Sequence, residues 1–193
     1  MDKNLKYSMI FGSSLTSFVF GFSNPTLILY FNTHVNPSIF AISNMLSLGL
    51  GALVNNSVNY NKFMDIYRKY FSYIIFIDLI CCGVIYIFSA DHISFRYISI
   101  AIINSITTNL WGIIMNNAIN KNIGGDNLTK FNASVHAFEL WTCMLGTILY
   151  LILSEIDLNI SINNCLLIQW IAMFIMGMID MRSYKKLTIN KNK

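Results

Sequence analysis

The chain has 193 residues, of which 55% are hydrophobic and only 11% are charged, and its formal net charge is +4. A soluble domain normally carries about 25% charged residues, so this composition excludes an ordinary soluble domain and indicates a membrane protein. The high hydrophobicity also excludes a disordered chain.

Six apolar runs follow one another along the chain, and most are far longer than the roughly 4–8 residues of a buried strand. A helix needs about 20 apolar residues to cross a bilayer, where its backbone groups must bond to one another. We therefore predict an all-α membrane bundle of six transmembrane helices, forming one domain over residues 1–193. The predicted spans are 10–31, 38–58, 70–88, 97–119, 132–153 and 162–179.

The basic residues fix an orientation. Of the 13 lysines and arginines, all but Arg96 fall at the two ends, in the second connection or in the fourth connection. These regions share one side of a six-span protein, and basic loops stay in the cytoplasm. We therefore expect both termini in the cytoplasm, most simply at a bacterial inner membrane, with residues 181–193 as a basic tail. This distribution follows topology and excludes a nucleic-acid-binding patch.

Small residues recur at intervals of four in the first two spans, which places them on one face of each helix. Close packing of small residues is a main cause of helix association in a bilayer. We predict that these faces pack within the bundle, although a dimer interface would use the same residues. They are Ser13, Ser17, Gly21, Ser43, Ser47 and Gly51.

Asn24 and Pro25 interrupt the first span. Proline removes a backbone donor and frees a carbonyl one turn earlier, which neighbouring helices can satisfy in a membrane. Interrupted helices often line the substrate sites of transporters. The pair therefore predicts either a packing kink or one wall of a substrate cavity.

Asp78 lies near the centre of the third span, in "YIIFIDLICC". A charged aspartate at this depth costs about 2.5–3.5 kcal/mol on insertion scales. No lysine or arginine occurs at matching depth, so we expect a neutral or hydrogen-bonded carboxyl. It could relay protons, or it could only bond a neighbouring polar side chain.

Polar residues in the fourth span share one helical face, because their spacing is i, i+4, i+7. They could line a cavity or bond to other helices, and we take them as candidates for the cavity. They are Asn104, Thr108 and Trp111.

The fifth span carries His136 and Glu139 in its cytoplasmic third. A stripe of Cys143, Thr147 and Tyr150 continues from them, which indicates a face directed toward protein or a cavity. We expect a gate or a helix contact here, and with Asp78 these two residues are the candidates for proton coupling.

No catalytic or metal-binding pattern occurs. The four cysteines lie in apolar runs without metal-ligand spacing, and no nucleophile–base pair or phosphate loop is visible. We therefore expect no enzyme activity, no metal and no cofactor.

Three stretches resemble the N-terminal half of a major facilitator superfamily transporter. "GFSNPTLILYF" is similar to the end of that family's first helix, "LGLGALVNN" before "NKFMDIYRKY" to its second helix and loop, and "NLTKFNASVHAFELWTCMLGTIL" to its fifth helix. The resemblance implies transport of a small solute or drug. Since family members carry two such halves, it also implies a homodimer or a second membrane subunit.

A second function remains open. Of the family's loop motif only Gly51 is present, with Asn55 and Asn56 at its acidic and first basic positions. That departure favours a non-transport membrane protein, such as an immunity protein against a bacteriocin or toxin, or an accessory subunit of a membrane complex.

Overall fold

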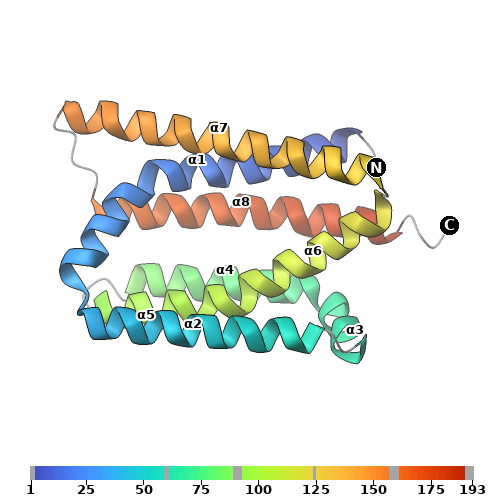
Figure 1. The fold of residues 1–193 in the computed structure, drawn as a ribbon, viewed down its shortest axis with the longest axis horizontal. Coiled ribbons are helices and arrows are strands. Elements are labelled where there is room, and N and C mark those ends of the chain that lie inside the picture. The colour runs from blue at the N-terminus through green and yellow to red at the C-terminus, as the bar shows by residue number, and fades with distance from the viewer. Residues whose placement is uncertain (1–2, 59–60, 89–92, 124, 157–160, 190–193) are drawn as a thin grey trace. The chain divides into compact units, whose positions relative to one another are not determined.

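The computed structural model describes residues 3–58, 61–88, 93–123, 125–156 and 161–189 (Figure 1). Within these ranges every regular element is a helix, which confirms the predicted all-α class. The elements are α1 (Lys3–His34), α2 (Pro37–Val58), α3 (Asn61–Lys69), α4 (Phe71–Phe88), α5 (Ile93–Ile103), the π-helix η1 (Asn104–Thr108), α6 (Asn109–Asn122), α7 (Asp126–Glu155) and α8 (Ile162–Ile189).

Three of the described helices are long and apolar enough to cross a membrane by length and composition: Pro37–Ser57 in α2, Asp126–Glu155 in α7 and Ile162–Thr188 in α8. A shorter apolar stretch, Phe71–Val84, lies in α4. The chain thus has the features of an integral membrane protein. The other predicted spans, their total of six and the orientation stay predictions.

Several helices differ in extent from the spans predicted for them, and α1 and α7 begin seven and six residues earlier than predicted. The predicted fourth span is divided among α5, η1 and α6, with the π-helix at its centre. The sixth span was predicted to end at residue 179, whereas α8 continues to Ile189. Residues 181–189 of the predicted basic tail are therefore the last turns of a helix.

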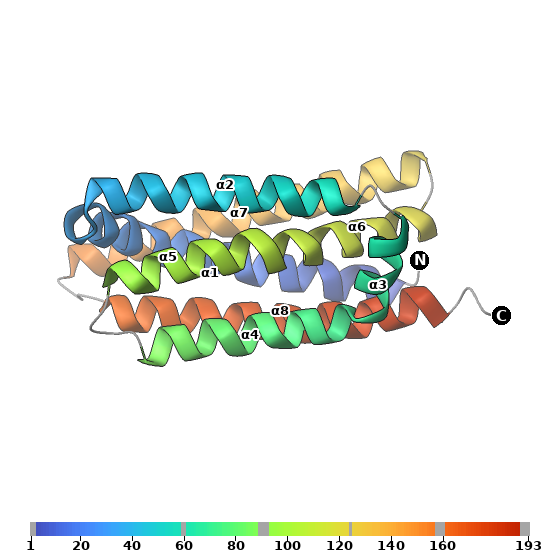
Figure 2. The ribbon, with the colours of Figure 1, turned by 90° about the horizontal axis from the view of Figure 1, so that it is seen from below.

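The helices form two compact units. The first unit contains Met1–Leu29 and Ala118–Lys193, and the second contains Tyr30–Asn117. In the second unit α5 and η1 lie between α2 and α4 (Figure 2), and the short helix α3 connects α2 to α4. The Tyr67 hydroxyl on α3 lies 3.1 Å from that of Ser57 on α2, which holds the connection against the end of α2.

In the first unit α1 contacts both α7 and α8. The Thr16 hydroxyl of α1 lies 3.5 Å from the sulfur of Met176 on α8, and a Cβ at Gly12 would lie 3.2 Å from the Cδ1 of Ile179. The small residues Gly12 and Thr16 thus allow α1 to pack close to α8.

The contact between α1 and α7 is closer still, because backbone meets backbone. A Cβ added at Gly21 would lie 2.8 Å from the carbonyl carbon of Cys143, and one at Gly146 would lie 2.9 Å from the amide nitrogen of Phe22. Neither approach leaves room for a side chain. Two glycines on facing helices therefore set the separation of α1 and α7, in the manner of small-residue contacts between membrane helices.

We predict that Gly146→Ala lowers the free energy of unfolding by about 2–3 kcal/mol, because the new methyl group meets backbone atoms that cannot rotate away. The matched control is Gly49→Ala in α2, where nothing lies within 4 Å of the added Cβ. That control should leave stability equal or slightly higher, since alanine is the better helix former. Thermal unfolding of the detergent-solubilised protein measures both, and equal melting temperatures for the two variants would contradict the prediction.

Candidate functional site

The most deeply buried acidic side chain among the described residues is Asp78, on α4. It shares one face of the helix with Phe71, Ile75 and Cys82, and all four side chains are 1% exposed or less. The spacing of this stripe is that of an α-helix face packed against protein. The carboxyl therefore lies inside the second unit and not on its surface.

Among the described residues two side chains reach the carboxyl, and both reach the same oxygen. The hydroxyl of Thr107, in η1, is hydrogen-bonded to Asp78 Oδ1, and the Cys82 thiol lies 3.9 Å from that oxygen. Asp78 Oδ2 is buried and has no hydrogen-bond partner within the described residues. A buried oxygen without a partner is rare and calls for a chemical reason.

Polar side chains in and beside the π-helix bond to its backbone. The Thr107 hydroxyl lies 2.8 Å from the carbonyl oxygen of Ile103, and the Asn109 side-chain amide donates to the carbonyl of Ser105 at 2.7 Å. Hydroxyl and amide side chains compete in this way with backbone hydrogen bonds, which favours departure from regular α-helix. Single π turns occur frequently at functional sites.

The small residues of α2 face this segment. The hydroxyl groups of Ser47 and Ser105 are hydrogen-bonded, and a Cβ at Gly51 would lie 3.2 Å from the Asn109 side-chain nitrogen. Ser43 is fully buried on the same helix. Ser47 thus contacts η1, Gly51 lies against α6, and Ser43 lies in the interior of the second unit.

The cavity candidates of the fourth span cannot all be compared with this arrangement. The side chains of Asn104 and Thr108 lie outside the described residues, and Trp111 is buried. The regular i, i+4 spacing assumed for residues 104 and 108 differs from the structure, because both belong to the π-helix. A π turn advances the chain by an extra residue, which rotates the following residues away from the expected face.

Asn24 and Pro25 lie where α1 meets its two neighbours in the first unit. The helix continues through Pro25, which removes the donor normally paired with the carbonyl of Gly21. The Thr147 hydroxyl of α7 lies 3.2 Å from that carbonyl oxygen. The same hydroxyl lies 3.1 Å from the Cys143 carbonyl oxygen, so its one proton is shared between a carbonyl of α7 and the carbonyl that Pro25 leaves free.

A glutamine of α8 bonds to the same turn of α1. The Gln169 side-chain amide donates to Ser23 Oγ at 2.6 Å and to Asn24 Oδ1 at 3.0 Å. Ser23 and Gln169 are both buried. These contacts fit the packing interpretation of Asn24 and Pro25 better than an open cavity wall, because the polar atoms already have protein partners.

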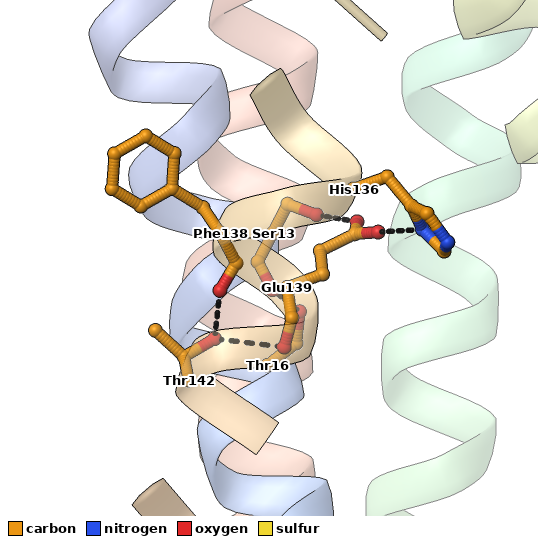
Figure 3. A network of polar contacts seen from close by, with 6 residues as sticks. All are labelled: Ser13, Thr16, His136, Phe138, Glu139 and Thr142. Atoms are coloured by element: carbon orange, nitrogen blue, oxygen red, sulfur yellow. Dashed lines mark hydrogen bonds and ion pairs between the residues drawn. The ribbon is translucent and has the colours of Figure 1, made fainter. Parts of the chain in front are cut away.

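A further group of polar side chains joins α1 to the N-terminal half of α7 (Figure 3). The Ser13 hydroxyl donates to one carboxyl oxygen of Glu139, and His136 Nδ1 lies 3.5 Å from the other. The His136 side chain is 73% exposed and that of Glu139 is 33% exposed. This cluster is therefore at the surface, and it matches a helix contact or a gate more closely than a deep binding site.

Several residues that matter here carried no clear sequence signal. Thr107, Gln169 and Gly146 are not among the candidate residues predicted from the sequence. A glutamine in an apolar run is the one signal that could have indicated Gln169, because a buried amide needs a partner. Ser17, the remaining predicted packing residue of α1, is half-buried.

The described residues contain no group of three side chains suited to hold a metal ion. Searches of family models, curated proteins and solved structures found no match to the chain. The chemistry of its polar groups is therefore the basis for any functional proposal.

We predict that Gln169→Leu lowers the free energy of unfolding by about 1–3 kcal/mol, because it leaves the buried oxygens of Ser23 and Asn24 without this donor. Asn164→Leu, at an exposed position of the same helix, is the control for added hydrophobicity. Thermal unfolding in detergent is the measurement. Unchanged stability of the Gln169 variant would show that the amide contributes nothing to the junction of α1 and α8.

Proposed function

We propose that the chain is a transporter-like membrane protein that moves a small solute or drug and couples this movement to protons. The observation that carries the proposal is Asp78, a fully buried carboxyl on an apolar helix with one oxygen unpaired among the described residues. Ionisable groups in membrane helices are costly and typically belong to ion or proton pathways. A purely structural carboxyl would be expected to have both oxygens bonded.

The other polar groups support a division of roles. Glu139 and His136 are partly exposed on the N-terminal half of α7, and an exposed carboxylate and imidazole can exchange protons. Asp78 is enclosed by protein. We assign proton exchange to the surface pair and coupling to the buried carboxyl, each within its own unit.

The resemblance to one half of a two-half transporter supports action as a dimer or with a second membrane subunit. The layout resembles the N-terminal half of a major facilitator transporter, and two halves are needed to enclose a path across the bilayer in that family. An N-in, C-in orientation in a bacterial inner membrane completes this proposal. The proposed solute path includes Asn104, Thr108 and Trp111.

We predict that Asp78→Asn and Glu139→Gln each reduce proton-driven flux at least tenfold in proteoliposomes, because each removes an exchangeable proton without changing side-chain volume. The probes are ethidium and a panel of radiolabelled amino acids and sugars, driven by an imposed pH gradient. Asp65→Asn, at an exposed position of α3, should leave flux unchanged. The absence of flux with every probe, or full flux in both variants, would overturn the proposal.

A second candidate function is favoured by α7, whose apolar side chains are largely exposed. Phe138, Trp141, Leu145, Ile148 and Ile152 are each more than 40% exposed along this helix. Such a face suits lipid or the surface of another membrane protein. It would serve an immunity protein or an accessory subunit, which binds a membrane partner and moves nothing.

The two candidate functions predict different survival of cells that express the chain and are challenged with bacteriocins. An immunity protein would protect cells challenged with membrane-active bacteriocins, and Trp141→Ala together with Phe138→Ala should abolish that protection. The transporter proposal predicts that the chain gives no bacteriocin-specific protection and that these two substitutions cause no loss of solute flux. Survival curves against a panel of purified bacteriocins separate these outcomes.

A further inference from the structure

The two carboxyl oxygens of Asp78 have different surroundings in the second unit. Its Oδ2 is buried without a partner among the described residues, while Oδ1 meets the Thr107 hydroxyl and the Cys82 thiol. An ionised carboxylate accepts hydrogen bonds at both oxygens, and leaving one bare in an apolar interior is costly. A neutral carboxylic acid carries no such charge.

The hydrogen bonds of Thr107 also favour the protonated form of Asp78. The Thr107 oxygen lies against Asp78 Oδ1 and also 2.8 Å from the carbonyl oxygen of Ile103. A hydroxyl has one proton and can donate it fully to only one of two acceptors. If Asp78 is protonated, its own O–H donates to Thr107 Oγ, and the Thr107 hydroxyl donates to Ile103. Each contact then has one donor and one acceptor.

Among the described side chains, no charged group that could hold Asp78 ionised contacts it. On α4 the neighbouring titratable groups are the thiols of Cys81 and Cys82, and η1 presents the Thr107 hydroxyl. On α3, Arg68 forms an ion pair with Asp65 at 3.4 Å. This helix ends just before α4 begins, and the start of α4 lies about 10 Å from Asp78 along the helix axis, at a rise of about 1.5 Å per residue. Within the described residues no lysine, arginine or histidine forms an ion pair with Asp78. The side chain of Arg96, on α5, lies outside them.

We propose that Asp78 and Thr107 form a proton-binding site whose occupancy sets the hydrogen bonding of the π turn. With the proton bound, Asp78 donates to Thr107, and Thr107 donates to the Ile103 carbonyl. When the proton leaves Asp78 Oδ1 for water, the Thr107 hydroxyl turns from Ile103 to the carboxylate. The Ile103 carbonyl then loses its side-chain donor, so the junction between α5 and α6 loosens.

This inference deepens the proposed function, since it names the proton as the coupling ion and η1 as the element that responds. Protonation of Asp78 itself does not depend on transport. Infrared spectroscopy of the full chain in lipid nanodiscs can therefore test it without any flux assay, because the C=O stretch of a protonated carboxyl is separate from that of a carboxylate.

At neutral pH we expect a protonated-carboxyl band that Asp78→Asn removes completely. Thr107→Val keeps the carboxyl but removes its partner, so it should shift this band toward the frequency of a carboxyl without a hydrogen bond. The control variants are Asp65→Asn and Thr188→Val, which change an exposed carboxyl and an exposed hydroxyl. Both should leave the band unchanged.

Three results would overturn the inference: no protonated-carboxyl band in the wild type, a band that persists in Asp78→Asn, or a band that sodium ions abolish at constant pH. The last result would identify a sodium site. If the band behaves as expected but no solute moves, the proton site stands and the transport proposal fails. If flux depends on Asp78 but the band is absent, transport stands and the proton site fails.

Discussion

Polar groups withdrawn from water must find hydrogen-bond partners within the protein, and this constraint governs each polar contact described above. The carbonyl of Gly21, left without its usual donor by Pro25, lies within hydrogen-bond distance of the Thr147 hydroxyl. The Ser105 carbonyl in the π-helix receives the Asn109 side-chain amide. Bonds of this kind replace the solvent that a membrane interior does not provide.

Two buried side-chain oxygens lack a partner within the described residues, Ser14 Oγ and Asp78 Oδ2, and of these only the carboxyl of Asp78 is ionisable. Ser23 and Gln169 bond to each other, and Ser47 bonds to Ser105. Asp78 has one oxygen bonded and one oxygen without a partner within the described residues. A group that is buried, ionisable and incompletely bonded is the one most affected by the gain or loss of a proton. For this reason the functional proposal rests on Asp78 more than on the exposed Glu139 and His136.

The sequence allowed the helical class to be predicted, because apolar runs of this length leave few alternatives to a helix. It also singled out Asp78, since one acidic residue among apolar neighbours needs no structure to be noticed. Glu139 was predicted to lie near an end of its helix, whereas in the structure it lies near the middle of α7, because that helix begins at Asp126 and not at residue 132.

What could not be predicted depends on contacts between residues far apart in the chain. The bond from Gln169 to Asn24 joins positions 145 residues apart, and no local pattern indicates such a pairing. The π-helix at Asn104–Thr108 leaves no mark in the apolar periodicity of the sequence. Gly146 has its role only because Phe18 and Phe22 of α1 lie against it.

The central claim is that Asp78 is held as a neutral acid inside the protein. Solid-state NMR of the chain in lipid, with 13C in the aspartate side-chain carboxyl groups, reads this directly because the chemical shift of that carbon changes with protonation. The Asp78 signal is assigned by its absence in Asp78→Asn. The account predicts that this signal has the shift of a protonated carboxyl at neutral pH. A carboxylate shift for Asp78 at neutral pH would contradict it.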